Sequence, residues 1–128
     1  MHICIVDDDA AIRSMLRMTF EEEGYQVVEA TNGQTALQCL QEHHDPSVVL
    51  LDYMMPVLDG GQLLRIVAEG QPLPANHAFI LMTAADRILP QSVQSLLQQL
   101  QVPTETKPFN LNHLIETVAT LCAILEVS

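Results

Sequence analysis

The sequence predicts an α/β domain in which helices cover both faces of a parallel sheet. Five strand-like runs alternate with five helical patterns along the chain, and such alternation is typical of parallel strands joined by crossover helices. Three of the runs, HICIV, VVLL and FILM, are continuously apolar. Strands that are buried on both faces have this composition. The three runs therefore belong in the middle of the sheet.

The N-terminal half of the chain alternates three predicted strands with two predicted helices. Residues 2–7 and 47–52 are apolar runs that end in aspartate, and residues 25–30 carry two adjacent valines. Residues 10–23 and 34–43 repeat apolar side chains at the three- and four-residue spacing of a helix. A glycine directly after the first helical pattern is a stop signal.

The C-terminal half continues with three helices and two strands. The helical patterns cover residues 61–69, 90–101 and 111–126. A loop over residues 70–77 precedes an apolar strand at residues 78–83. Residues 102–106 are the weakest strand because they include a proline, which a sheet tolerates at its edge. We therefore predict that this last strand lies at the edge of the sheet.

Composition limits the chain to a few classes of protein. Its 128 residues suffice for one domain, over residues 1–128. The formal net charge of −11 argues against nucleic-acid binding by this domain, and no apolar run approaches the ~20 residues of a membrane helix. Cys4, Cys39 and Cys122 form no metal-type pair, so we interpret all three as buried thiols in a reducing compartment, the cytoplasm.

The residues at the predicted strand ends converge on one edge of the sheet. Parallel strands place their carboxyl ends at the same edge, where sites form in open sheets. The first strand ends in Asp7-Asp8-Asp9, the third in Asp52 and the fourth in Thr83. The fifth ends just before Lys107, which is the only lysine in the chain. We interpret Asp9 as the cap of the following helix and the other residues as a site.

The chemistry of such a site follows from its charges. Neighbouring carboxylates repel one another unless one takes up a proton or a cation lies between them. Oxygen ligands select hard ions such as Mg²⁺ or Mn²⁺, and a carboxylate beside the ion can attack phosphorus to form an aspartyl phosphate. The histidines have no partners at ligand spacing, and we interpret all five as surface or structural residues.

Four short motifs resemble the receiver domains of bacterial response regulators, and the resemblance covers essentially the whole chain. Each motif is weak alone, but their order and spacing together are specific. They are I-V-D-D-D at 5–9 with Arg13 following, L-L-D-Y-M-M-P at 50–56 with Asp59-Gly60 following, M-T-A at 82–84 and K-P-F at 107–109.

The resemblance implies a flavodoxin-like sheet of five strands, in the order 2-1-3-4-5, with five helices. It also implies a phosphoprotein whose phosphoacceptor is Asp52. Thr83 would bond the phosphoryl group, and Lys107, which precedes an expected cis proline, would pair with Asp52. The Mg²⁺ ligands would be Asp8, Asp52 and the backbone carbonyl of Met54, with Asp7 acting through water.

The family's partners are implied in the same way. A phosphohistidine on a sensor histidine kinase or a phosphotransfer domain would donate the phosphoryl group, and an output domain or effector would respond. No turnover of a free substrate and no membrane contact are expected, and a homodimer is left open. Thr104 stands where most receivers carry a Tyr or Phe that moves on phosphorylation, so we expect a different route to the output.

Two other functions are compatible with parts of the sequence. A Mg²⁺-dependent phosphohydrolase of the haloacid dehalogenase type also uses an aspartate nucleophile, in a D-x-D motif that Asp7-Asp8-Asp9 contains. That function leaves Asp52 and the K-P-F segment unexplained. A degenerate, non-phosphorylated interaction module is the second alternative, although such modules usually lose the acceptor or the lysine.

Overall fold

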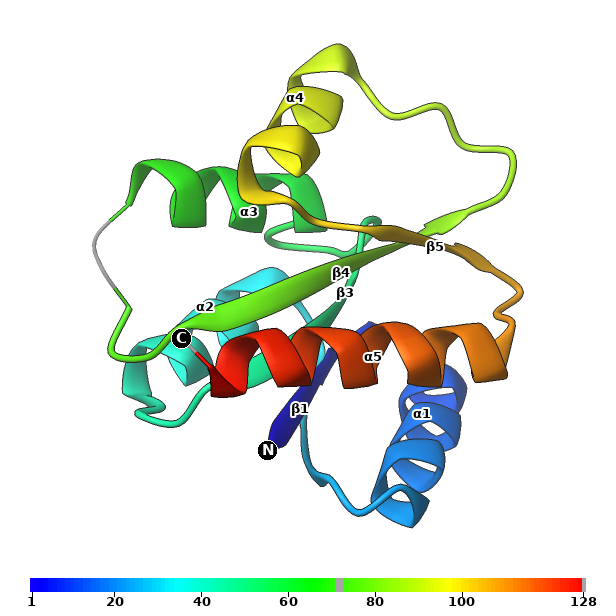
Figure 1. Cartoon of the computed structure of the whole chain (residues 1–128). Coiled ribbons are helices and arrows are strands. Elements are labelled where there is room, and N and C mark those ends of the chain that lie inside the picture. The colour runs from blue at the N-terminus through cyan, green and yellow to red at the C-terminus, as the bar shows by residue number, and fades with distance from the viewer. Residues whose placement is uncertain (71–72, 128) are drawn as a thin grey trace.

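The computed structural model describes residues 1–70 and 73–127 of the chain. They form one sheet of five parallel strands in the order β2-β1-β3-β4-β5, with a helix after each strand (Figure 1). This is the predicted fold class and strand order. The strands are β1 His2–Val6, β2 Gln26–Ala30, β3 Ser47–Asp52, β4 His77–Ala84 and β5 Thr104–Lys107. The helices are α1 Ala10–Glu22, α2 Gly33–Glu42, α3 Gly60–Glu69, α4 Gln91–Leu100 and α5 Leu111–Glu126.

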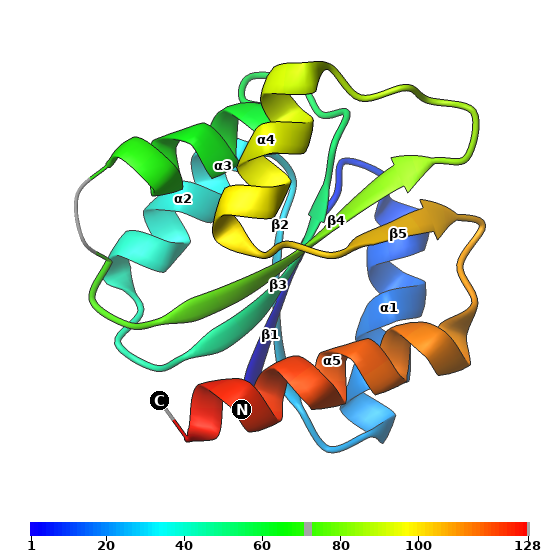
Figure 2. The same cartoon turned by 45° about the horizontal axis from the view of Figure 1, so that its top comes forward.

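The helices form two layers, one on each face of the sheet (Figures 1 and 2). Helices α1 and α5 pack on one face, where Phe20 and Leu114 are fully buried against strand residues such as Ile80. Helices α2, α3 and α4 cover the other face, where Leu40 and Leu63 are buried. Successive residues of β1, β3 and β4 feed the two cores alternately, which explains their continuously apolar sequences.

Polar side chains fix where the helices begin. The carboxylate of Asp9 accepts hydrogen bonds from two backbone N–H groups at the start of α1, as predicted. Asn32 and Asn110 cap α2 and α5 in the same way. Asp59 and Gln62 form a reciprocal capping box at the start of α3. Each cap sits directly after the loop that leaves the carboxyl end of a strand, so the caps also hold the loops around the candidate site.

The edge position of β5 is confirmed, but its predicted bounds were wrong. Residues 102–103 precede the strand, and Pro103 accepts a hydrogen bond from the backbone N–H of Leu81 through its carbonyl oxygen. Proline has no N–H to donate, so regular pairing begins only after it. Pro90 likewise stands at the cap position before α4 rather than inside it. Residues 71–72 of the predicted loop over 70–77 lie outside the described residues.

None of the described helices has the length and apolar character that a membrane span requires.

Candidate functional site

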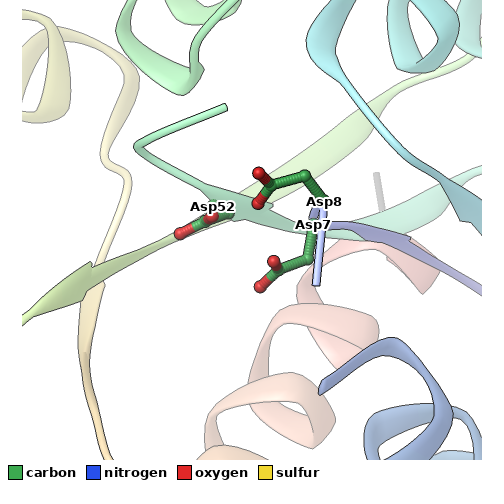
Figure 3. A group of neighbouring side chains, drawn as sticks. All are labelled: Asp7, Asp8 and Asp52. Atoms are coloured by element: carbon green, nitrogen blue, oxygen red, sulfur yellow. The ribbon is translucent and has the colours of Figure 1, made fainter. Parts of the chain in front are cut away.

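The site lies at the carboxyl ends of β1, β3, β4 and β5, where the sequence placed it. Asp7 and Asp8 directly follow β1, and Asp52 is the last residue of β3 (Figure 3). Each of the three carboxylates offers one oxygen, and these oxygens all lie within 4.8 Å of one another. Asp7 is fully buried and Asp52 is 6% exposed, whereas Asp8 is exposed.

Lys107, at the end of β5, connects two of these carboxylates. Its Nζ atom lies 2.9 Å from Oδ2 of Asp7 and 3.1 Å from Oδ1 of Asp52. Burial opposes the charge on Lys107, but the hydrogen bonds with the two aspartates outweigh it and raise the pKa of the ammonium group. One positive charge therefore faces three negative ones, and the cluster keeps an excess of negative charge.

Asp52 carries an electrostatic cost in this cluster. Burial and then the neighbouring charge of Asp7 raise the pKa of Asp52 to about 6, although the hydrogen bond from Lys107 acts in the opposite direction. Carboxylates at such short distances favour the binding of either a proton or a cation. Three carboxylate oxygens are the ligand set of a hard divalent ion, so the chemistry of these donors fits Mg²⁺ or Mn²⁺.

The hydroxyl group of Thr83 completes the polar surface near Asp52. Thr83 is 7% exposed, and its Oγ1 has no hydrogen-bond partner among the described residues. It lines a small hollow of about 190 Å³ together with Asp52, Met54 and Lys107. A buried hydroxyl without a partner is costly, so rotation of the Thr83 side chain toward an oxygen-bearing group in this hollow would give the hydroxyl a partner.

The loop after β1 is held by its own contacts. The side chain of Asp7 accepts a hydrogen bond from the backbone N–H of Asp9 at 2.9 Å. Arg13, on α1, donates from Nη1 to the backbone carbonyl of Asp7 at 2.7 Å and also pairs with Glu29 of β2. These contacts orient the buried carboxylate before any ligand arrives, which is how preorganised sites save ordering cost.

Sequence reasoning missed one side chain near the site and misjudged the burial of another. The guanidinium carbon of Arg87, in the loop after β4, lies 5.9 Å from the centre of the Tyr53 ring, and both residues line the hollow. No spacing rule marks an arginine in an irregular loop. Cys39 was predicted to be buried but is partly exposed, because it lies at the border of the buried face of α2. Cys4 and Cys122 are buried as predicted.

The described histidines lie apart from the carboxylate cluster. His43 contacts Cys39. At the amino ends of β3 and β4, Nδ1 of His77 accepts a hydrogen bond from the backbone N–H of Ser47 at 3.2 Å. His113 pairs with the buried Glu105 at 2.7 Å. None of these contacts involves Asp7, Asp8 or Asp52.

Residues 3–119 match the sequence model of the response regulator receiver domain. The chain belongs to this family. Its fold is also that of a CheY-like receiver domain protein from Methanospirillum hungatei JF-1, with a TM-score of 0.85 and 28% sequence identity over 99% of this chain and 98% of that one. Receiver domains of two-component systems generally bind Mg²⁺ at an acidic pocket, and the described part of this chain has a cluster of three aspartates.

Two curated relatives show how receiver domains are used. Sporulation initiation phosphotransferase F of Bacillus subtilis is 32% identical over 91% of this chain and 89% of its own length. The aerobic respiration control protein ArcA of Escherichia coli is 37% identical over 85% of this chain, but the match spans only 43% of ArcA. The receiver domain thus spans less than half the length of several relatives that it matches.

Members of this family mostly have no enzymatic activity of their own. One relative, a protein-glutamate methylesterase/protein-glutamine glutaminase of Hahella chejuensis, is named as an enzyme, and this receiver domain covers 23% of its length at 40% identity. Receiver domains work with histidine kinases and with output domains, and one structural neighbour carries a GGDEF domain.

Proposed function

We propose that this chain is a single receiver domain, over residues 1–128, in which Asp52 accepts a phosphoryl group. The observation that carries the proposal is the position of Lys107, whose Nζ lies within 3.1 Å of carboxylate oxygens of both Asp7 and Asp52. The contact orients Asp52, which lines the hollow. It also leaves the positive charge of the Lys107 ammonium group beside the incoming phosphoryl oxygens. Asp7 is fully buried, which favours Asp52 as the nucleophile and disfavours the D-x-D phosphohydrolase alternative.

We further propose which residues hold the divalent ion. Carboxylate oxygens of Asp8 and Asp52 and the backbone carbonyl of Met54 would bind Mg²⁺, or Mn²⁺, with Asp7 acting through water. The support is that oxygens of the three carboxylates lie within 4.8 Å of one another and that Met54 lines the hollow beside Asp52. When bound, the ion supplies positive charge for the carboxylates and for the phosphoryl oxygens.

The chain's own side chains then divide the work of phosphoryl transfer. A carboxylate oxygen of Asp52 attacks the phosphorus of a phosphohistidine, the new O–P bond forms, and the N–P bond to the imidazole breaks. Lys107 moves its hydrogen bond from Asp52 to a phosphoryl oxygen and offsets its charge. Thr83 donates its hydroxyl hydrogen to another phosphoryl oxygen, which satisfies a buried group that otherwise has no partner among the described residues.

The proposed donors are sensor histidine kinases or histidine phosphotransfer domains, and the proposed place of action is the cytoplasm. The chain itself would turn over no free substrate. An output domain or an effector would read the phosphorylated state. Family membership supports these partners, and their identities are left to experiment.

Intact-mass spectrometry after incubation with acetyl phosphate and Mg²⁺ tests the proposal. We expect one phosphoryl adduct on the wild-type chain, none on Asp52→Asn, and an unchanged adduct on Asp45→Asn, an exposed aspartate before β3. Omission of Mg²⁺ should abolish the adduct. An adduct that persists in Asp52→Asn would move the acceptor elsewhere, and steady hydrolysis of a simple phosphate ester would instead support the phosphohydrolase.

A further inference from the structure

Two cysteines face each other between α2 and β1, away from the phosphoryl site. Cys4 lies in the middle of β1 and is 1% exposed, and Cys39 lies near the end of α2 and is partly exposed. The Cys4 and Cys39 thiols interact, since each shifts the pKa of the other. Cα atoms of α2 and β1 approach within 8 Å of one another, and the ring of His43, just after α2, packs against the ring of His2 of β1, so the two elements are in direct contact.

A histidine also contacts the Cys39 sulfur. His43, one turn further along the chain, places Nδ1 at 3.4 Å from Sγ of Cys39 and at 3.2 Å from its backbone carbonyl. The His43 ring also packs edge-on against His2, with 5.7 Å between the ring centres. The sulfur of Cys39 therefore contacts an imidazole that is itself fixed by the Cys39 carbonyl and by the His2 ring.

These surroundings shift the pKa values of the two thiols in opposite directions. The hydrogen bond from Cys4, followed by the charge and hydrogen bond of His43, lowers the pKa of Cys39 to about 6, although burial and Glu42 act in the opposite direction. The hydrogen bond to Cys39 and then burial raise the pKa of Cys4 well above its usual value. A partly exposed thiolate beside a protonated thiol is the arrangement of an attacking and a resolving cysteine.

The third cysteine provides an internal comparison. Cys122 is buried in the other core, beneath α5, where burial raises its pKa although a hydrogen bond with Tyr25 lowers it. It lies on the opposite face of the sheet from Cys4. Its thiol is therefore expected to react slowly in the folded protein.

We propose that Cys4 and Cys39 form an oxidisable dithiol whose co-reactant is a peroxide and whose product is a disulfide that joins α2 to β1. This site is separate from the phosphoacceptor, and its chemistry does not depend on the proposed phosphorylation. Strand β1 leads directly to Asp7 and Asp8 of the acidic cluster. The disulfide would therefore link this strand to α2, on the face of the sheet opposite α1 and α5.

The reaction takes two balanced steps. The Cys39 thiolate attacks one oxygen of the peroxide, so that an S–O bond forms, the O–O bond breaks, and the leaving oxygen takes up a proton. The Cys4 sulfur then attacks the sulfenic sulfur of Cys39, so that the S–S bond forms and the S–O bond breaks. The proton of the Cys4 thiol leaves with the hydroxyl group as water. The two sulfurs together lose two electrons, and the peroxide gains them.

Peptide mapping of the oxidised wild-type protein tests the proposal without any change to the core. The reduced protein would be treated with hydrogen peroxide, quenched, denatured in the presence of N-ethylmaleimide and digested. We expect a linked Cys4–Cys39 peptide pair, with Cys122 recovered as the alkylated thiol. Recovery of Cys4 and Cys39 as alkylated thiols, or oxidation of Cys39 to sulfinic acid with Cys4 still free, would overturn the proposal.

Two matched histidine variants test why Cys39 reacts. His43→Gln removes the imidazole beside the sulfur, and we expect it to slow disulfide formation several-fold. His44→Gln changes the exposed neighbouring histidine and should leave the rate unchanged. Equal rates in the two variants would contradict the role of His43.

A trapping variant then tests the order of the two steps. Cys4→Ser removes the resolving thiol, so the sulfenic acid of Cys39 should accumulate and be labelled by dimedone. Circular dichroism of the same sample checks that the variant is folded. Labelling of Cys122 in place of Cys39 in the folded variant would contradict the assignment of Cys39 as the attacking thiol. The phosphoryl adduct at Asp52, measured separately by mass, distinguishes failure of this proposal from failure of the proposed function.

Discussion

At the scale of single residues, the role proposed for Asp52, that of a nucleophile, conflicts with the surroundings of its carboxylate. A nucleophilic carboxylate has to be ionised, yet Asp52 is 6% exposed and lies beside Asp7 and Asp8. Lys107 compensates only part of this cost, since the pKa of Asp52 is still raised to about 6. Without a divalent ion, the site therefore weakens the folded state in order to hold a reactive group.

This cost leads to a prediction about stability and pH. The folded protein binds the Asp52 proton more tightly than the unfolded chain does, so the free energy of unfolding falls as pH rises from about 4 to about 6. At neutral pH, Asp52→Asn should remove the cost and stabilise the metal-free protein by about 1 to 3 kcal/mol. Urea denaturation in excess EDTA, at acidic and at neutral pH, measures the difference. A variant less stable than the wild type at neutral pH would contradict the argument.

Most of the site residues could be predicted because the carboxyl ends of parallel strands lie together at the same end of the sheet. Asp7, Asp8, Asp52, Thr83 and Lys107 all lie where their strands end. Individual roles at the site remain proposals. The position of Arg87 over Tyr53 was not predictable, because it depends on the path of an irregular loop. The partial exposure of Cys39 was not predictable either, because apolar neighbours in sequence do not show where a buried helix face ends.

At the scale of elements, helix α3 begins in very close contact with the end of β3. A Cβ atom added to Gly60 would lie 2.6 Å from the backbone carbonyl oxygen of Asp52 and 2.9 Å from a methyl carbon of Leu81. The cap residue Asp59 precedes this glycine and fixes the helix start. The absence of a side chain at Gly60 thus lets the loop after Asp52 return to the sheet.

We expect Gly60→Ala to lower the free energy of unfolding by about 1 to 3 kcal/mol, because the added methyl group forces the backbone apart. Gly61→Ala is the matched control. Its added Cβ would meet a side chain, Val93, at 3.1 Å, and side chains give way more easily than backbone. Urea denaturation of both variants measures the effect. A larger loss in Gly61→Ala than in Gly60→Ala would argue against the importance of this contact.

The regular elements followed from the sequence, whereas the limits of β5 did not. Apolar strands and amphipathic helices have periodic patterns, but β5 is a short edge strand with polar residues on its exposed side. Thr104 is exposed there. The next residue, Glu105, is buried and its carboxylate contacts the imidazole of His113 of α5. Thr104 has no aromatic ring that could move into the protein on phosphorylation. We therefore still predict an output route that differs from that of receivers with a Tyr or Phe at this position.

At the scale of the whole molecule, a net charge of −11 and a cluster of three carboxylates both favour divalent cations. A ligand at ten times its Kd stabilises the folded state by about 1.4 kcal/mol, which raises the Tm of a domain of this size by about 3 to 8 °C. We expect Mg²⁺ to raise the Tm of the wild-type protein by an amount in this range.

Two controls separate site binding from general screening. Sodium chloride at equal ionic strength should raise the Tm much less than Mg²⁺, because monovalent ions screen surface charge without filling the cluster. Asp8→Asn removes an exposed ligand and should abolish most of the Mg²⁺ effect. Thermal unfolding followed by circular dichroism gives all these values. Equal responses of the wild type and Asp8→Asn to Mg²⁺ would place the ion elsewhere.

The two edges of the sheet also affect how this domain behaves in concentrated solution. An exposed edge strand is a template on which another chain can extend the sheet and aggregate. Here β5 offers four residues, follows a proline and includes the charged Glu105 and Lys107. At the other edge, Glu29 of β2 is ion-paired with Arg13 and Arg17 of α1. Neither edge strand is long and apolar, so the architecture disfavours aggregation of the domain through edge-to-edge pairing of its sheets.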